Sequence, residues 1–117
     1  MKNALGKTTK AKSESHDTLL PLLQSMSEEF KELSKKKPDS AVSKSKITIV
    51  NRLLEAIRLI LKDEASITYL DLLDEDSVPQ VSDVSLILSQ YVAAMQAFRS
   101  RYYGYIDGDH QWSLVSK

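Results

Sequence analysis

The segment 71–83, DLLDEDSVPQVSD, holds five carboxylates in thirteen positions. Clustered carboxylates can bind a hard divalent cation or act as a general acid and base. A calcium loop also needs a glycine at its sharp turn, whereas this segment contains no glycine and is interrupted by Pro79. We therefore favour a solvated loop between two helices over a weak cation site, and we expect no metal and no cofactor. The carboxylates are Asp71, Asp74, Glu75, Asp76 and Asp83.

Histidine chemistry is limited to His16 and His110, because the chain contains two histidines and no cysteine. His110 lies beside Asp107 and Asp109, and a histidine near carboxylates can serve as a base or a metal ligand. No positioned nucleophile and no glycine-rich loop accompanies it. His16 lies where a polar tail meets the first helix, so we expect it to be exposed. The sequence therefore favours a protein that is not an enzyme.

A basic patch is expected around the first loop between helices. Such a patch could bind the phosphates of a nucleic acid, with a strong dependence on salt. The same cations could instead stabilise a helix C-terminus and remain solvated, and the chain lacks the sequence marks of a nucleic-acid-binding module. We favour this second interpretation. The residues of the basic patch are Lys35, Lys36, Lys37, Lys44, Lys46, Arg52 and Arg58.

The segment 98–105, FRSRYYGY, interleaves arginine with aromatic residues. Such a surface can stack on bases or form the centre of a protein interface. Phe98 and Tyr102 continue a helical apolar stripe and are expected in the core, whereas the side chains off that stripe form a candidate interaction patch. A packing cluster near the C-terminus is an equally good interpretation. The candidate interaction patch consists of Arg99, Arg101, Tyr103, Tyr105 and Trp112.

The overall composition is that of a single folded domain. The chain has 117 residues, of which 42% are hydrophobic and 27% charged, and its formal net charge is zero. Residues 1–47 carry ten lysines and six acids, while residues 48–117 carry six basic residues and ten acids. A neutral total argues against a surface dedicated to nucleic acid, although the asymmetry allows a local patch. No apolar run is long enough for a secretory signal or a membrane span, so we expect a soluble cytoplasmic protein.

Three segments with the apolar periodicity of amphipathic helices must position all of these groups. The first is expected over about 18–36, with Asp17 as the N-cap and Pro21 in the first turn. The second is expected over about 43–62, and its apolar face is broad enough to contact more than one neighbour. The periodic apolar residues are Leu19, Leu23, Met26, Phe30 and Leu33 in the first helix, and Ile47, Val50, Leu54, Ile57 and Leu61 in the second.

The third long helix is expected over about 82–103. Ser82 is a suitable N-cap, and Gly104 is a suitable left-handed stop after the last turn. Alanines flank its apolar face and would let another helix approach closely. A short helix is also expected before it, over about 66–73. The periodic residues of the third helix are Val84, Leu88, Tyr91, Met95, Phe98 and Tyr102, and the alanines are Ala93, Ala94 and Ala97.

The two ends of the chain differ from the helical segments. Residues 1–16 are polar and rich in lysine, so we expect a disordered tail followed by a single helical domain over 17–117. Near the other end, Asp107-Gly108 is a tight-turn dipeptide that indicates a short hairpin, with Trp112 packing back onto the helices. The sequence thus predicts an all-α bundle of three long helices and one short helix.

Such a bundle has more apolar helix surface than one layer of three helices can cover. The broad face of the second helix and the alanine-flanked face of the third are the sources of this surplus. We therefore expect a small protein-interaction module (an adaptor, a regulator or a neutralising partner) that binds a protein partner or forms a homodimer through its helix faces. The alternative is a nucleic-acid-binding protein that uses the basic patch. An enzyme or metal protein is the least favoured class.

Overall fold

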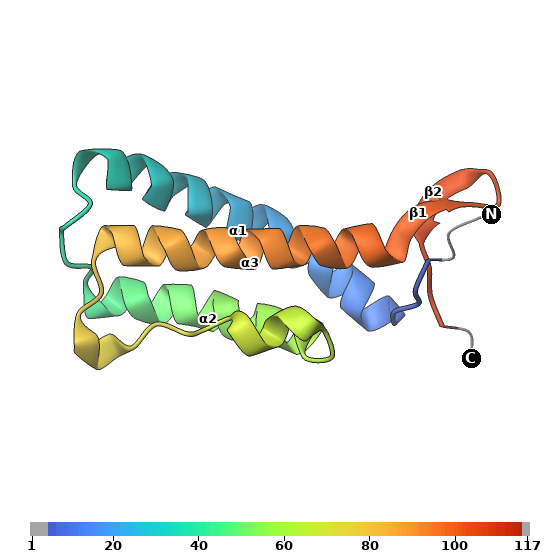
Figure 1. The fold of residues 1–117 in the computed structure, drawn as a ribbon, viewed down its shortest axis with the longest axis horizontal. Helices are drawn as coiled ribbons and strands as arrows, with labels where there is room; N and C mark the ends of the chain where they lie inside the picture. The colour runs from blue at the N-terminus through green and yellow to red at the C-terminus, as the bar shows by residue number, and fades with distance from the viewer. Residues whose placement is uncertain (1–4, 116–117) are drawn as a thin grey trace.

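The computed structural model describes residues 5–115 and is mostly helical, which confirms the predicted bundle of three long helices (Figure 1). A two-stranded antiparallel hairpin follows the last helix and confirms the predicted C-terminal hairpin. Two short 3-10 helices, η1 and η2, lie between the second and third long helices. The elements are α1 (Lys10–Lys36), α2 (Lys44–Leu61), η1 (Ala65–Tyr69), η2 (Glu75–Ser77), α3 (Val81–Tyr102), β1 (Tyr103–Ile106) and β2 (Asp109–Trp112).

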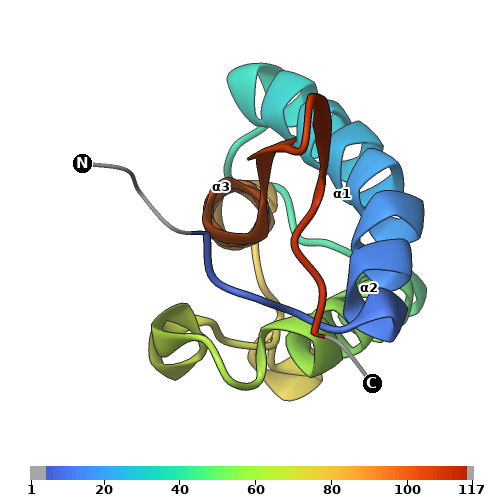
Figure 2. The same ribbon diagram turned by 90° about the vertical axis from the view of Figure 1, so that its right-hand side faces the viewer.

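Helix α3 runs along the long axis of a molecule that measures 50 × 25 × 23 Å (Figure 1). Helix α1 crosses α3 and packs mainly on it, whereas α2 meets α1 and α3 less extensively. The end-on view in Figure 2 shows α1 and α2 grouped beside α3. The hairpin lies at one end of the long axis, and the α1–α2 loop lies with η2 at the other end (Figure 1).

The core follows the predicted faces of α2 and α3. The five periodic residues of α2 are at most 1% exposed, and those of α3 from Val84 to Phe98 are at most 2% exposed. Burial of each such side chain contributes about 1.5–3 kcal/mol, so these two faces supply much of the driving force for folding. The face of α1 is less completely covered: Leu23 and Phe30 are buried, but Leu33 is 36% exposed.

Helix α1 begins about two turns before its predicted start, so residues 10–16 are helical and the prediction of disorder there was wrong. Thr9 is the N-cap, and its Oγ1 accepts a hydrogen bond of 3.1 Å from the Lys12 amide. Asp17 lies inside the helix, so its prediction as the N-cap was also wrong. Residues 1–4 of the expected tail lie outside the described residues.

Pro21 lies in the interior of α1 and not in its first turn, which corrects its predicted position. A proline has no N–H group, so the carbonyl four residues earlier, that of Asp17, loses its helical donor. The Pro21 side chain is exposed, which leaves this side of the helix open to water. Tertiary contacts at the start of α1 must therefore offset the cost of an interior proline.

Those contacts come from residues near the two ends of the described chain, around Thr8 and Leu114, which pair beside the start of α1 (Figure 2). The Thr8 amide donates to the Ser113 carbonyl at 2.9 Å, and the Val115 amide donates to the Thr8 carbonyl at 2.9 Å. We call this pairing the terminal bridge. Ser13 and His16 are buried on the first turns of α1, so these turns depend on packing more than on helix propensity.

The predicted short helix over 66–73 is only partly helical. Its first part forms η1, but the chain is extended from Leu70 onward. Leu70 and Leu73 are both buried, so they reach the core from an extended segment. Because 3-10 hydrogen bonding is stable only over short runs, the packing of these leucines decides the conformation.

Polar side chains of α2 and α3 hold the extended segment 70–73. Asn51 acts as a substitute strand partner: its Nδ2 donates to the Leu73 carbonyl, and its Oδ1 accepts from the Leu73 amide, both at 2.9 Å. These bonds satisfy backbone groups that would otherwise be unpaired near the core. The other bonds to the segment run from Arg58 to the Leu70 carbonyl and from the Tyr91 hydroxyl to the Asp71 carbonyl.

The ends of α3 differ from their predicted signals. The N-cap is Gln80 and not Ser82, and the Gln80 amide donates to the Asp83 Oδ2 at 2.9 Å. Gly104 is a strand residue of β1, so its prediction as a left-handed stop was wrong. A Cβ on Gly104 would lie 3.0 Å from the Leu5 Cδ1, so the glycine lets the N-terminal segment approach the hairpin closely.

The hairpin turn is the predicted Asp107-Gly108 pair. Asp107 has a φ of 49° and Gly108 a φ of 92°, so both residues adopt the left-handed region. This is the backbone of a type I′ turn, whose twist matches that of two antiparallel strands. The register pairs Tyr103 with Trp112, which places both aromatic side chains at the foot of the hairpin.

Candidate functional site

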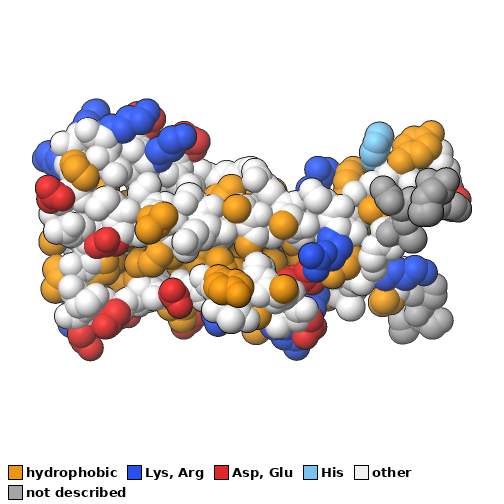
Figure 3. Space-filling model, viewed as in Figure 1, with side chains coloured by type: hydrophobic (Ala, Val, Ile, Leu, Met, Phe, Trp, Pro, Cys, Tyr) orange, Lys and Arg blue, Asp and Glu red, His pale blue; other side chains and the backbone are white. Residues whose placement is uncertain are grey.

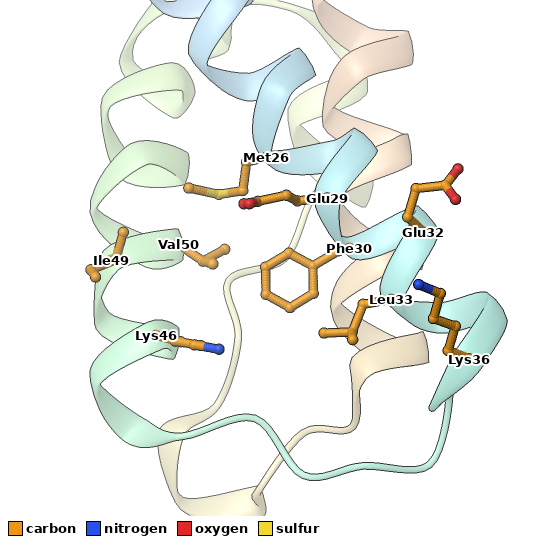
Figure 4. A pocket seen from close by; sticks show the side chains of 9 residues that line it. All are labelled: Met26, Glu29, Phe30, Glu32, Leu33, Lys36, Lys46, Ile49 and Val50. Atoms are coloured by element: carbon orange, nitrogen blue, oxygen red, sulfur yellow. The ribbon is translucent and has the colours of Figure 1, made fainter.

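An apolar groove lies between α1 and α2 (Figure 4). It consists of two adjoining hollows of about 470 and 440 Å³, which share Met26, Glu29 and Ile49. The groove exists because α1 packs mainly on α3 and meets α2 less extensively. We call it the α1–α2 groove. Its apolar lining includes Leu22, Met26, Phe30, Leu33, Ile49 and Leu53.

The floor of the α1–α2 groove is packed, while its walls are exposed. Phe30 and Val50 are only 9% and 1% exposed, and Figure 4 shows the Phe30 ring pointing from α1 toward α2. Leu22, Leu33 and Ile49 are 55%, 36% and 49% exposed, although they line the same groove. Grouped apolar side chains with this much exposure mark interaction sites more often than isolated ones do.

The two walls of the groove carry net charges of opposite sign. Glu29 projects from α1, and both hollows include it, as they include Ile49. Lys46 and Arg52 project from α2, one helical turn to either side of Ile49, so Glu29 lies at a level between them. Over residues 5–115, none of these three charges forms an ion pair. They are therefore available to a bound partner.

This arrangement suits the apolar face of a helix that has charges along its edges. Helix α2 has 18 residues and provides a wall of about 27 Å, which is long enough for several turns of a bound helix. Over the same described residues, no three histidine, cysteine, aspartate or glutamate side chains are grouped as metal ligands. The chemistry that the groove offers is thus burial of apolar surface with charged edges.

The structure divides the candidate interaction patch. The Arg99 guanidinium lies 3.9 Å from the centre of the Tyr103 ring, and that ring meets Trp112 edge-on at 5.4 Å between centroids. Tyr105 extends beyond them on the hairpin and is 69% exposed. Arg101 does not take part in the cluster of Arg99, Tyr103 and Trp112, and instead pairs with a carboxylate that follows α2. Packing within the chain therefore uses most of these side chains.

That carboxylate, Glu64, is a buried charge to which no sequence motif points. It is 8% exposed and accepts hydrogen bonds of 2.8 Å from the Arg101 Nη1 and the Tyr102 hydroxyl. Burial, together with the neighbouring Glu64, raises the pKa of Tyr102. Arg101 and Tyr102 are neighbours in the sequence, but Glu64 precedes them by 37 and 38 positions, so only the fold brings the carboxylate to them. They tie the end of α3 to the residues that follow α2.

His16 is fully buried, so the prediction that it is exposed was wrong. Its Nε2 lies 2.9 Å from the Met95 carbonyl and must donate to it, because a carbonyl can only accept. The imidazole stacks on Phe98 at 5.6 Å and meets Trp112 edge-on at 5.0 Å. Trp112 in turn donates to the Asp17 Oδ2 at 3.1 Å, which confirms that it packs back onto the helices.

The acidic segment 71–83 lies at the surface, with all five of its carboxylates exposed. Asp74 Oδ1 accepts from the Asp76 amide at 3.0 Å, and Asp83 accepts from an amide at the start of α3, so two of the acids cap the chain locally. His110 is exposed on β2 beside Tyr105, at 5.3 Å between ring centroids. These groups do not converge with the α1–α2 groove.

The five lysines of the basic patch are exposed and lie at the end of the molecule that holds the α1–α2 loop, where Figure 3 shows lysine and arginine side chains over the end of α1. Acids interrupt this surface: Lys35 pairs with Glu32 at 3.2 Å, and Lys44 lies 4.0 Å from Asp76. Arg58 is turned away toward the extended segment after α2. The structure thus gathers only part of the predicted patch.

Comparison of this chain with models of known protein families, with curated proteins and with solved structures finds no match. Over residues 5–115, no helix combines the length and the apolar character needed to span a membrane. Two features of the described residues can support a functional proposal: the α1–α2 groove with the charges along its walls, and the lysines around the α1–α2 loop.

Proposed function

We propose that this chain is a protein-interaction module that binds an amphipathic helix in the α1–α2 groove, as an adaptor, a regulator or a neutralising partner would. The observation that supports the proposal is the exposure of Leu22, Leu33 and Ile49 along one groove. Each square ångström of apolar surface that a partner removes from water contributes about 25 cal/mol. A bound helix would bury all three side chains at once.

The form of the groove favours a helix over a small molecule. Small-molecule sites are enclosed and contain a few convergent polar groups that fix the orientation of the ligand. Here the groove is open along its length, and Glu29, Lys46 and Arg52 stand along its edges instead of converging on one point. Charges at the edge of an apolar strip fix the register of a helix and disfavour wrong partners.

The proposal is tested by photo-cross-linking in cells that express the full chain. A benzophenone amino acid replaces Ile49 in the groove, and in a matched control it replaces Leu86, which is 60% exposed on α3 outside the groove. We expect protein adducts of discrete mass from position 49 and none of the same masses from position 86. Leu22→Asp should remove the adducts, because it places a carboxylate in the apolar strip.

Two results would overturn the proposal. One is the absence of any protein adduct at position 49. The other is an identical set of adducts from positions 49 and 86, since this would show nonspecific contact. A Leu22→Asp variant that keeps its circular dichroism spectrum and still forms every adduct would also count against the groove.

A second candidate function is nucleic-acid binding at the basic patch. One observation favours it: the fold brings five lysines, from the end of α1 and the start of α2, to one end of the molecule. Charge reversal at Lys36 and Lys44 should then abolish binding to a fluorescent oligonucleotide at about 50 mM salt, where phosphate contacts are strong. Binding that survives this reversal, or that never occurs at this salt concentration, excludes the function.

A further inference from the structure

We propose that the occupant of the α1–α2 groove is a second copy of this chain, with α1 of each copy lying against α2 of the other. Two α1–α2 pairs then form a four-helix bundle around a two-fold axis that runs along the groove. This inference rests on the proposed function, because it names the partner of the same groove. The argument for it is the complementarity of the two walls.

Two symmetric arrangements could close such a dimer. If the two-fold axis runs across the groove, α1 faces the partner's α1 and α2 faces the partner's α2, so each rim meets a rim of the same net charge. If the axis runs along the groove, the acidic wall faces the partner's basic wall on both sides. The α1 rim carries Glu29, Glu32 and Lys36, a net charge of −1, and the α2 rim carries Lys46 and Arg52, a net charge of +2. Electrostatic complementarity therefore selects the axis along the groove.

The register of this arrangement follows from the levels of the side chains. Rotation about an axis along the groove moves no residue along that axis, so each residue keeps its level. Glu29 lies at the level of Ile49, between Lys46 and Arg52. The partner's Glu29 would thus lie between Lys46 and Arg52 of the first copy, and the symmetric contact would repeat this on the other side.

The apolar side chains fit the same register. The partner's Ile49 would meet α1 at the level of Glu29, in the space between Met26 and Leu33, one turn to either side. Ile49 is 49% exposed and Leu33 36% exposed in the single chain, so each would gain a partner. Insertion of one side chain between two residues of a facing helix is the packing of helical bundles.

The test uses light scattering and sedimentation of the full chain over about 1–200 μM. We expect a dimer of twice 13.2 kDa. Glu29→Arg alone, and Lys46→Glu together with Arg52→Glu alone, should each raise the dimer dissociation constant about tenfold or more. An equimolar mixture of these two variants should form a dimer again, because each rim then faces a rim of opposite net charge. Glu55→Arg, at an exposed position of α2 outside the groove lining, is the matched control and should leave the dimer unchanged.

Folding of each variant is checked by its circular dichroism melting curve. If Glu29→Arg does not fold, Glu29→Gln should still weaken the dimer severalfold, because it removes the charge with little change in shape. A monomer at every concentration overturns the inference, and so does a dimer that neither charge reversal weakens or a mixture that does not restore it. An adduct at position 49 with a different protein, alongside a monomeric chain, overturns this inference but leaves the proposed function standing.

Discussion

At the scale of single residues, the buried carboxylate of Glu64 is stabilised by side chains that are distant in the sequence, so no local motif identifies it. Its two carboxylate oxygens are occupied by Arg101 and Tyr102. Loss of Arg101 or Tyr102 would leave a Glu64 oxygen without a hydrogen bond, and loss of Glu64 would leave the Tyr102 hydroxyl without one. An unsatisfied polar group near the core destabilises the fold. The residue therefore ties the end of α3 to the residues that follow α2.

Replacement of Glu64 tests this role. We expect Glu64→Gln to destabilise the fold by about 1–2 kcal/mol, because the amide keeps one acceptor but loses its charge opposite the half-exposed Arg101. Chemical denaturation measures the change. Glu55→Gln, at an exposed position of α2, is the control and should change the free energy of unfolding by less than about 0.5 kcal/mol. Equal effects of the two substitutions would contradict the role of Glu64.

A second residue-scale prediction concerns Tyr91, which is fully buried and donates to the Asp71 carbonyl at 2.9 Å. Burial raises its pKa above the ordinary value of 10.0, and the nearby Arg58 offsets part of this effect. Because the phenol gives up its proton more readily in the unfolded chain, the unfolded state becomes relatively more favourable once the pH passes the unfolded pKa. The stabilising contribution of the neutral Tyr91 is thus complete below the unfolded pKa and is lost as the pH rises through the folded pKa. The free energy of unfolding should therefore fall above about pH 10.

Tyr91→Phe isolates that contribution. At pH 7 the variant should lose about 1 kcal/mol, because the Asp71 carbonyl loses its donor. Between about pH 9 and pH 12 its stability should fall less steeply than that of the parent chain, since one buried phenol no longer ionises on unfolding. Denaturation midpoints measured over this range give both slopes. A variant slope as steep as the parent's would exclude Tyr91 as a source of the alkaline loss.

At the scale of the elements, Asn51 fixes the position of the extended segment 70–73, which lies between α2 and α3. We expect Asn51→Ala to destabilise the fold by about 2–3 kcal/mol, because both backbone groups of Leu73 lose their partner near the core. Thr48→Ala removes an exposed hydrogen bond on the same helix and should cost less than about 0.5 kcal/mol. Hydrogen exchange at the Leu73 amide should accelerate in the first variant alone. Protection of that amide in Asn51→Ala would show that the bond is dispensable.

The periodicity of apolar residues correctly predicted the helices whose buried faces are apolar. The buried faces of α2 and α3 were predicted correctly because every third or fourth residue on them is apolar. The Asp107-Gly108 turn was predicted correctly because the two turn residues alone favour this conformation. The first turns of α1 were missed, since their buried residues Ser13 and His16 are polar and His16 packs on residues from Met95 to Trp112, 79 to 96 positions away. The bonds of Asn51 to the Leu73 backbone were also missed, because no short-range pattern indicates that a polar helix residue pairs with a backbone 22 positions away.

The groove was only partly predictable for the same reason. The breadth of the apolar face of α2, including Ile49 and Leu53, indicated a second contact surface. The exposed wall that α1 contributes was missed, because Leu22 is not one of the periodic apolar residues predicted for the first helix. Which apolar face remains uncovered depends on the angle at which α1 crosses α3, and this angle is set by packing between distant residues.

At the scale of the whole molecule, the terminal bridge joins the two ends of the described chain. Thr8→Pro removes the amide that donates to the Ser113 carbonyl, so we expect a loss of about 1–3 kcal/mol and faster hydrogen exchange in the first two turns of α1. Exchange in α2 should be unchanged. The measurement is exchange followed amide by amide by NMR. Uniform acceleration through α1, α2 and α3 would show that the bridge opens only when the whole bundle unfolds.

The terminal bridge also sets an order of events while the chain is being made. A ribosome releases the N-terminal side of α1 first, and Trp112 and Ser113 follow about 100 residues later, which is about 5–20 s at about 5–20 residues per second. During that interval His16 lacks its edge-on contact with Trp112, and Thr8, just before α1, lacks its partners in the terminal bridge. The first-made part of α1 is thus among the last parts to become ordered, so a nascent chain that stalls before residue 112 presents an unravelled N-terminal segment to chaperones and proteases.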